Sequence, residues 1–426
     1  MKLETLCLHA GQELDPSSLS CGQPVYRTAA YHFKSTAHAA DLFAVKEVGN
    51  IYTRLTNPTH DLLEKRVAAM EGGAAALVLA SGMSAIFNTV INICRAGDEI
   101  VSAANLYGGS FTMFNDILPQ FGIKTHFVEP LQLDSFKRAL TPKTKLIYVE
   151  TLGNPALDMI DLESVAAVAA EHGVPLVVDS TFTTPYLLRP IEYGASIVVH
   201  SMTKWLGGHG SALGGVVVDS GRFDWSRGDF PLFNEPEPSY HDLRFAHDFG
   251  ELSKLAFIVR MRLVPLRNLG ACLSPDNAWI ILQGIETLPL RMQRHCQNAM
   301  AVAEFLKAHA QVAWVRYPGL ESDPAFATAQ KYLKRGFGGM VVFGIKGGRQ
   351  AGVRWIESLK LFSHVANVGD AKSLAIHPAS TTHAQLSAEQ QRLGGISPDL
   401  IRLSIGIEHI DDIISDLEQA FAALQA

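Results

Sequence analysis

The feature that most constrains the fold is a repeated alternation of short strand-like runs with helix-like segments. The strand-like runs cover residues 77–80, 99–101, 146–149, 176–178 and 197–199. Most of them are apolar at every position, which is typical of strands buried on both faces of a parallel sheet. Helical spacing of apolar residues lies between the runs, and parallel strands need such crossover connections. The sequence therefore predicts an α/β fold with a mostly parallel, doubly wound sheet.

The chain of 426 residues is long enough for two domains with an additional segment. Residues 1–60 have few periodic runs, so we expect an irregular arm that lies against another part of the molecule or a second subunit. Residues 61–275 form the predicted large domain, and residues 276–426 a smaller α/β domain. The smaller domain is predicted to begin with a long helix over 276–309 and to contain strands at 340–345 and 401–407.

Composition and charge narrow the classes of partner and compartment. Hydrophobic residues make up 47% and charged residues 18% of the chain, and the net charge is −6. No basic run with interleaved aromatic residues is present, so nucleic acid is not an expected partner. No apolar run approaches the roughly 18 residues of a membrane span, and the N-terminus lacks the apolar core of a signal peptide. Five scattered cysteines favour a reducing, cytoplasmic setting.

The histidines do not predict a metal site. Four of them lie near the motifs discussed below: His200, His209, His377 and His383. These four lack both the i,i+4 helical spacing and the cysteine partners that zinc ligands commonly show. We therefore predict no bound metal.

A lysine and two hydroxyl groups follow the strand-like run at 197–199. They are Ser201, Thr203 and Lys204, and a glycine-rich stretch comes directly after them. In an open α/β sheet, ligands bind just beyond the carboxyl ends of the strands. A partly desolvated lysine there has an accessible neutral amine and can form a Schiff base, while the hydroxyls suit a phosphate. For a lysine taken alone, a solvated side chain in a flexible loop is the simpler interpretation.

Asp179 and the segment Ser81-Gly82-Met83 also follow strand-like runs. A carboxylate directly after three apolar residues must be paired or hydrogen-bonded to remain charged. Asp179 could cap the next helix, but together with Lys204 we favour a partner for the protonated ring nitrogen of pyridoxal phosphate (PLP). Gly82 and Met83 open a helix, where free backbone N–H groups and the helix dipole favour a phosphate.

Four further residues have both a structural and a functional interpretation. Tyr107 is either a half-buried loop aromatic or a ring that stacks on a flat cofactor and moves a proton. Arg402 lies in an otherwise aliphatic alternating run, so it marks either an exposed polar face or a clamp for a substrate carboxylate. Tyr52 and Arg54 are either solvated turn residues or contacts to another phosphate oxygen.

Taken together, these segments resemble the Cys/Met-metabolism family of PLP-dependent enzymes, which have the type I, aminotransferase-like fold. The resemblance covers nearly the whole chain. The motifs that carry it are Tyr52-Thr53-Arg54, Asn57-Pro58-Thr59, Ser81-Gly82-Met83, Leu106-Tyr107-Gly108, Gly153-Asn154-Pro155, Val178-Asp179-Ser180-Thr181, Ser201-Met202-Thr203-Lys204, His377-Pro378-Ala379-Ser380 and Arg402-Leu403-Ser404.

The resemblance implies a role for each site residue. Lys204 would carry the cofactor as a Schiff base, Asp179 would pair with the pyridine nitrogen, and Tyr107 would stack on the ring. The other expected cofactor contacts are Gly82, Met83, Ser201, Thr203 and Asn154, with Tyr52 and Arg54 reaching the phosphate of a neighbouring subunit. Arg402, helped by Asn367, would bind the substrate α-carboxylate. Members of the family usually form homotetramers built from dimers that share their active sites in this way.

Within the family, the chain is most similar to the O-acetylhomoserine sulfhydrylases. The similarity lies in the segments 231–241, 277–283 and 366–372. Gly109 stands where methionine γ-lyases usually have a cysteine, and Asn367 where lyases and cystathionine synthases usually have a serine. The resemblance thus implies γ-replacement on O-acetyl-L-homoserine by sulfide, giving L-homocysteine for methionine biosynthesis. The alternatives are a methionine γ-lyase or cystathionine γ-synthase-type activity and, more remotely, a non-catalytic PLP-binding protein.

Overall fold

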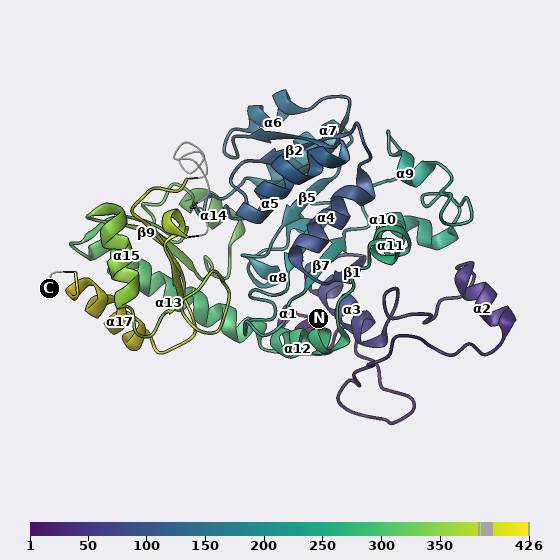
Figure 1. Ribbon diagram of the computed structural model, residues 1–426, viewed down its shortest axis with the longest axis horizontal. Helices are drawn as coiled ribbons and strands as arrows, with labels where there is room; N and C mark the ends of the chain where they lie inside the picture. The colour runs from purple at the N-terminus through teal and green to yellow at the C-terminus, as the bar shows by residue number, and fades with distance from the viewer. Residues whose placement is uncertain (382–383, 385–394, 425–426) are drawn as a thin grey trace.

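Two β-sheets of different size organise the protein (Figure 1). The structure is a computed structural model and describes residues 1–381, 384 and 395–424. His383 lies outside these residues. No helix in these ranges combines the length and the apolar content that crossing a membrane requires.

The larger sheet has seven strands in the order β1-β7-β6-β5-β4-β2-β3. The strands are β1 (Ala75–Leu79), β2 (Glu99–Ala103), β3 (Lys124–Val128), β4 (Thr144–Glu150), β5 (Leu176–Asp179), β6 (Ile197–Ser201) and β7 (Gly215–Asp219). Neighbouring strands from β3 to β6 are parallel, whereas β7 runs antiparallel to both β6 and β1. The predicted α/β fold with a mostly parallel sheet is therefore confirmed.

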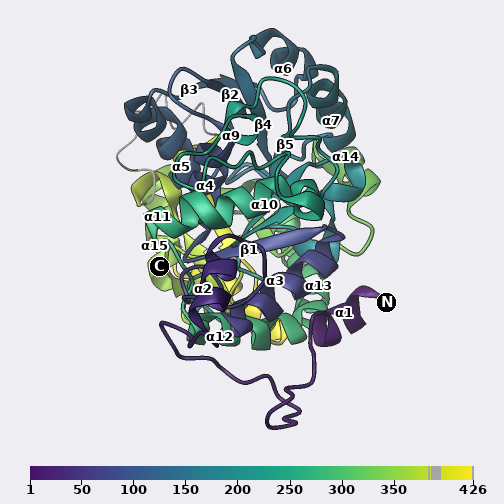
Figure 2. The same cartoon turned by 90° about the vertical axis from the view of Figure 1, so that its right-hand side faces the viewer.

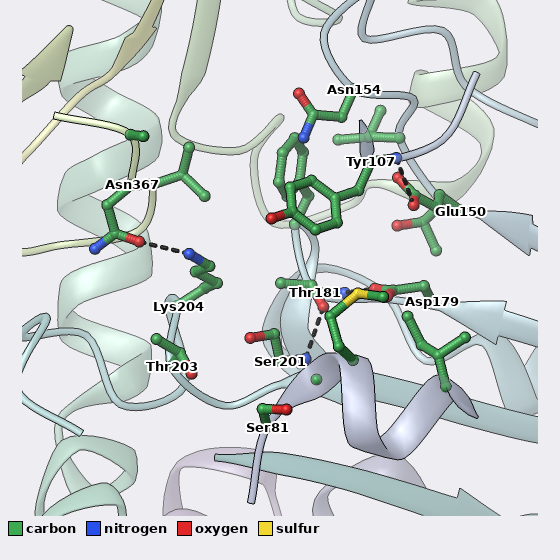
Figure 3. Close-up of a pocket in the computed structure, with 18 of the residues that line it drawn as sticks. Ser81, Tyr107, Glu150, Asn154, Asp179, Thr181, Ser201, Thr203, Lys204 and Asn367 are labelled. Atoms are coloured by element: carbon green, nitrogen blue, oxygen red, sulfur yellow. Dashed lines mark hydrogen bonds between the residues drawn. The ribbon is translucent and has the colours of Figure 1, made fainter. Parts of the chain in front are cut away.

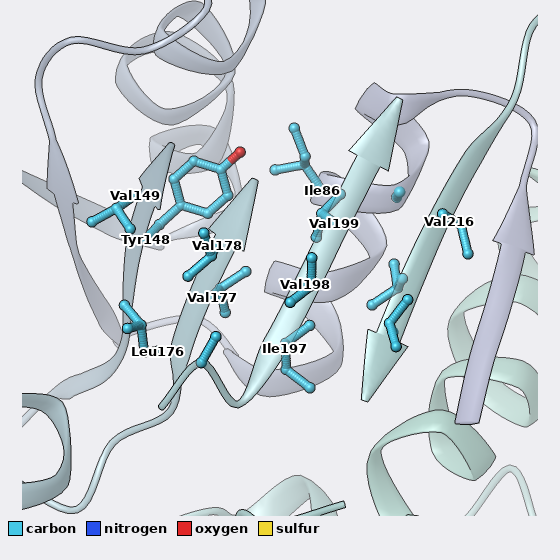
Figure 4. Close-up of a cluster of buried hydrophobic side chains, with 14 of the residues drawn as sticks. Ile86, Tyr148, Val149, Leu176, Val177, Val178, Ile197, Val198, Val199 and Val216 are labelled. Atoms are coloured by element: carbon cyan, nitrogen blue, oxygen red, sulfur yellow. The ribbon is translucent and has the colours of Figure 1, made fainter. Parts of the chain in front are cut away.

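Every residue of β4 and β7 is buried. This pattern indicates that helices cover both faces of the sheet, as is usual for parallel strands. The helices of this part of the chain are α3 (Pro58–Glu71), α4 (Gly82–Ile93), α5 (Gly108–Thr112), α6 (Leu133–Ala139), α7 (Leu162–Glu171), α8 (Thr184–Leu187), α9 (Pro231–Asn234), α10 (Ala256–Met261) and α11 (Arg267–Leu269). Figure 4 shows the branched side chains of β5 and β6 packed beside Ile86 of α4. Because these strands are rigidly buried, the residues at their carboxyl ends are held in fixed positions.

The smaller sheet has five strands in the order β10-β11-β12-β9-β8. Its strands are β8 (Val312–Arg316), β9 (Met340–Ile345), β10 (Ser363–His364), β11 (Leu374–Ile376) and β12 (Leu400–Ser404). The helices are α12 (Pro275–Glu286), α13 (Leu288–Ala308), α14 (Phe326–Tyr332), α15 (Gly348–Ser358) and α17 (Ile410–Ala422). The two sheets lie on either side of the predicted boundary at 275/276, and the exact division into domains stays a prediction. Figure 1 shows that α13 extends from the side of the large sheet toward the smaller sheet.

The single helix expected over 276–309 is two helices. The first ends at Glu286, and the second begins at Leu288. Pro289 stands in the first turn of α13, where a residue without an N–H is tolerated but cannot continue a preceding helix. The proline thus explains why the helical pattern is interrupted at Thr287.

Two short helices lie within residues 1–60, so the expectation of an irregular arm is wrong for these two segments. The helices are α1 (Leu3–His9) and α2 (Thr36–Phe43). Leu3 and Cys7 bury α1 against α3 and α12 of the same chain. In contrast, the arm from residue 11 to residue 57 extends away from the large sheet, as Figures 1 and 2 show.

The proline-containing segment 231–241 is ordered by burial of aromatic residues. Phe233 is fully buried, and the Tyr240 hydroxyl donates to the Phe43 carbonyl oxygen at 3.0 Å. This hydrogen bond joins the segment to α2 of the arm.

Candidate active site

One cavity lies at the carboxyl ends of β4, β5 and β6, between the two sheets (Figure 3). The polar and charged residues that line it come from both parts of the chain. They are Ser81, Tyr107, Glu150, Thr151, Asn154, Asp179, Thr181, Ser201, Thr203, Lys204, Asn367 and Arg402. Gly82 and Met83 also line the cavity. Of the predicted site residues, Tyr52 and Arg54 are not among the lining residues of this chain.

Lys204 lies in this cavity with its amine held by one side chain. Its Nζ donates a hydrogen bond to Oδ1 of Asn367 at 2.5 Å. Burial and the nearby guanidinium of Arg402 lower the pKa of Lys204 to about 8. A substantial fraction of the amine is therefore neutral and nucleophilic near pH 8, as Schiff-base formation requires. The interpretation of Lys204 as a solvated side chain in a flexible loop is therefore excluded.

Asp179 is held at the end of β5 by hydrogen bonds to its carboxylate. Its Oδ1 accepts from the backbone N–H of Thr181 at 2.9 Å, and its Oδ2 accepts from the hydroxyl of Tyr148 at 3.4 Å. Burial raises the pKa of Asp179, while the contacts with Thr181 and Tyr148 oppose that rise. A cationic group in the cavity would stabilise the charged carboxylate further.

The N-terminus of α4 forms an anion-binding corner with β6. Ser81 is the N-cap, and its hydroxyl accepts from the Ser84 backbone N–H at 3.1 Å. Gly82 approaches β6 so closely that an added Cβ would lie 2.6 Å from the Cβ of Ser201. The Thr181 hydroxyl accepts from the Ser201 backbone N–H at 2.9 Å and fixes the end of β6. Helix N–H groups and hydroxyls thus converge where a phosphate can bind.

Arg402 reaches the cavity from β12 of the smaller sheet. It is only 7% exposed, so the interpretation as an exposed polar face is wrong. Its Nη1 donates to Oδ1 of Asn154 at 2.9 Å, and burial lowers the pKa of Arg402 to about 10. Even so, the guanidinium remains charged at neutral pH and can bind a carboxylate with two parallel hydrogen bonds.

Tyr107 directs its ring into the cavity from the loop before α5 (Figure 3). Its side chain is 51% exposed, so the ring is accessible to a bound molecule. Its backbone N–H donates to Oε1 of Glu150 at 2.8 Å. Gly109 lies directly beside the ring, since an added Cβ there would be 2.6 Å from Cε1 of Tyr107.

A comparison of the sequence with known protein families agrees with the geometry of this cavity. The model of the "Cys/Met metabolism PLP-dependent enzyme" family matches residues 4–422. The chain belongs to this family. As a Cys/Met metabolism enzyme it uses PLP as its cofactor.

Individual members of the Cys/Met metabolism family are similar to this chain along nearly their whole length. The chain is 54% identical to the O-acetyl-L-homoserine sulfhydrylase of Leptospira meyeri, over 98% of this chain and 96% of that protein. It is 51% identical to O-acetyl-L-homoserine sulfhydrylase 1 of Thermus thermophilus, over 99% of this chain and 100% of that protein. A solved Campylobacter jejuni structure, described as an O-acetylhomoserine (thiol)-lyase with a pyridoxyl-lysine monophosphate at position 205, matches with a TM-score of 0.95 and 40% identity. That match covers 99% of this chain and 100% of the other.

The residues of the cavity fit PLP. The cofactor has an aldehyde, a phosphate and a pyridine nitrogen, and the cavity offers one matching group for each. These groups are the low-pKa amine of Lys204, the anion-binding corner at Gly82 and Ser201, and the half-buried carboxyl group of Asp179.

Sequence reasoning assigned no role to three residues that complete this site. Glu150 and Thr181 line the cavity, and Tyr148 contacts Asp179. Glu150 directly follows the apolar run at 146–149, just as Asp179 follows 176–178. The same rule about strand ends would therefore have found it. The role of Tyr148 depends on a contact between strands, and its own sequence neighbourhood is simply apolar.

Proposed function

We propose that the protein catalyses γ-replacement: O-acetyl-L-homoserine and sulfide give L-homocysteine and acetate. The observation that carries this proposal is the joint placement of Lys204, Asp179 and Arg402 around one cavity, in a chain similar over its full length to named O-acetyl-L-homoserine sulfhydrylases. In the reaction, the Cγ–O bond to acetate breaks and a Cγ–S bond forms. The product would enter methionine biosynthesis.

Lys204 and Asp179 are the groups that we assign to proton handling. When bound, PLP supplies an electron sink for negative charge that develops on the amino acid. Lys204, with its lowered pKa, serves as the base that removes the Cα proton of the substrate. Asp179 would hold the proton on the pyridine nitrogen, because the hydrogen bonds from Thr181 and Tyr148 orient its carboxylate and favour its charged form.

The remaining residues bind and orient. The backbone of Gly82 and Met83, with Ser201 and Thr203, holds the cofactor phosphate. Arg402 binds the substrate α-carboxylate, and Asn154 fixes the guanidinium for it. The ring of Tyr107 would face the bound cofactor, and its phenol would assist proton transfer near the leaving group.

Asn367 contacts the lysine that we assign as the catalytic base. Its amide oxygen accepts from the Lys204 amine, so the side chain is placed to orient the catalytic base as well as the substrate carboxylate. A serine at this position, as is usual in lyases, would be one atom shorter. We assign Asn367 and Gly109 as the residues that distinguish this reaction from that of a γ-lyase.

We also propose a cytoplasmic homotetramer built as a dimer of dimers. Tyr52 and Arg54 do not line the cavity of their own chain, and the arm that carries them extends from the large sheet. They are therefore free to reach the phosphate site of a second subunit. The five cysteines are free thiols, which suits a reducing compartment.

A product assay tests the proposed reaction. Purified enzyme with PLP and O-acetyl-L-homoserine is incubated with and without sulfide, and homocysteine and 2-oxobutyrate are both measured. We expect homocysteine to predominate with sulfide present. Predominant 2-oxobutyrate under that condition would instead identify a γ-lyase. A panel with succinyl and phospho esters, cysteine and methanethiol then defines the leaving group and the thiol donor, and separates cystathionine synthesis.

The variant Lys204→Ala tests the assignment of the lysine. The protein with PLP should absorb near ~420 nm because the amine is bonded to the cofactor. We expect Lys204→Ala to lose this band and to lose activity, whereas Lys372→Ala, at an exposed lysine, should keep both. An unchanged band in Lys204→Ala would show that another group holds the cofactor. If the wild-type protein has the band but turns over no substrate, it is a binding protein.

A further inference from the structure

Glu150 is a second carboxylic acid in the active-site cavity, next to Asp179. The two residues end the neighbouring parallel strands β4 and β5 and are paired in register. Residues in register on adjacent strands point to the same face of a sheet. Both line the cavity, and Glu150 is only 7% exposed.

The hydrogen bonds of the two carboxyl groups differ. Asp179 accepts from the Thr181 backbone N–H and from the Tyr148 hydroxyl. Glu150 accepts from one donor in the described part of the chain, the backbone N–H of Tyr107 at 2.8 Å. Glu150 is buried and Asp179 is half-buried, and two carboxylates this close repel each other, so one of them retains its proton. Since Asp179 has more donors, we assign the retained proton to Glu150.

The charged surroundings support this assignment. Burial and the negative charge of Asp179 both raise the pKa of Glu150 well above its ordinary value. The phenol of Tyr148 is a further ionisable group that interacts with it electrostatically. Lys204 and Arg402 line the same cavity, and Lys204 lies on the opposite side in Figure 3. No cation is hydrogen-bonded to Glu150 among the described residues.

The contact of Glu150 determines where Tyr107 lies. Tyr107 precedes α5 as its N-cap and has no side-chain capping bond of its own. Its ring is half exposed in the cavity, so packing alone does not fix it. The hydrogen bond to Glu150 therefore ties the backbone that carries this ring to the end of a rigid central strand.

We propose that Glu150 is a positioning residue that, as a neutral acid, fixes the Tyr107 backbone so that its ring faces the cofactor, without placing a second negative charge beside Asp179. The role of Glu150 in positioning Tyr107 rests on the proposed function, because it is tested by activity. The protonation state of Glu150 does not. The consequence of the proposed role is that an uncharged acceptor can replace Glu150, whereas loss of the acceptor cannot be tolerated.

The test compares Glu150→Gln, which keeps a neutral oxygen acceptor, with Glu150→Ala, which removes it. We expect Glu150→Gln to retain kcat/KM within about twofold at pH 7.5. Glu150→Ala should lose roughly ten- to a hundredfold, because small displacements of a catalytic group cost this much. Both variants should still show the absorbance of bound PLP, because Lys204 and Asp179 are intact. Equal loss in both variants, or full activity in Glu150→Ala, would overturn the proposal.

A measurement on the protein without PLP tests the protonation state and does not depend on the reaction. A neutral buried acid has a folded-state pKa above its unfolded value, so between these two values only the unfolded state ionises, and the wild-type protein loses stability as pH rises. The Tm of Glu150→Gln relative to wild type should therefore increase as pH rises from 5 through neutrality. A relative Tm that falls over this range would show that Glu150 acts as a stabilised carboxylate, and would contradict the proposal even if Glu150→Ala does not fold.

Discussion

Gly109 leaves room for the ring of Tyr107. The substitution Gly109→Ala, which adds one methyl group, tests whether this room is needed. An added Cβ at position 109 would lie 2.6 Å from the ring, so Gly109→Ala requires the ring to move. We expect kcat/KM for homocysteine formation to fall roughly tenfold, as expected for a displaced catalytic group. The Tm should not fall, because alanine favours the helical backbone of α5.

Two controls separate this effect from a general one. Gly22→Ala places a methyl group in open space and should leave activity unchanged. In a Tyr107→Ala background, Gly109→Ala should have no further effect, since the ring with which it clashes is gone. A loss of the same size in both backgrounds would show that Gly109 acts through something other than Tyr107.

Two of the predicted site residues lie at or just beyond the end of an apolar strand. Asp179 is the last residue of β5, and Lys204 lies three residues beyond the end of β6, where a buried strand leaves little freedom for the chain. The contact of Arg402 with Asn154 joins residues far apart in the chain, and local patterns contain no information about such a pair. The placement of Asn367 against Lys204 has the same origin.

Predicted and observed elements agree where a local period determines the structure. The strands β4, β5 and β6 and the helix α4 are each marked by a run of suitable apolar spacing. The strand β7 is also an apolar run, but its antiparallel direction depends on the neighbouring strands and is not contained in the local pattern. The short helix α1 was missed because helices of this length depend on tertiary packing, which α3 and α12 provide.

The end of β7 contains a buried acid that should make stability depend on pH. Burial raises the pKa of Asp219 to about 7, from an ordinary value of 3.8. Its Oδ1 accepts from the Gly221 backbone N–H at 2.8 Å, while Oδ2 has no partner in the described residues. Because the folded-state pKa is raised, the free energy of unfolding should fall as pH rises from about 4 to 7.

Asp219→Asn keeps the accepting oxygen and removes the charge, so it should abolish this pH dependence. At pH 8 the variant should be more stable by up to about 4 kcal/mol, since one pKa unit corresponds to about 1.4 kcal/mol. At pH 4 the two proteins should have similar Tm values. The exposed Asp134→Asn serves as the control, with no pH-dependent difference expected. A constant offset at all pH values would contradict the assignment of Asp219.

At the scale of the whole molecule, the arm is the part whose exposed surface a second subunit would explain. Within residues 11–51 its exposed large apolar residues are Leu14, Leu19, Phe33, Phe43 and Val48. Arg54 stacks on the ring of Tyr52, with 5.0 Å between the guanidinium carbon and the ring centroid. This pair is presented outside the chain's own cavity, so each active site should need the arm of a partner.

Hybrid enzymes test this sharing of sites. Lys204→Ala disables the cavity of its own chain, whereas Arg54→Ala should impair only the site of the partner. Random re-association of the two variants leaves one intact site in each mixed dimer, so activity should recover to roughly a quarter of wild type in an isologous dimer. Mixing Lys204→Ala with Asp179→Ala should give no recovery, because both residues act within their own cavity. Recovery absent from the first mixture would mean that each chain forms its site alone, and the arm would then need another explanation.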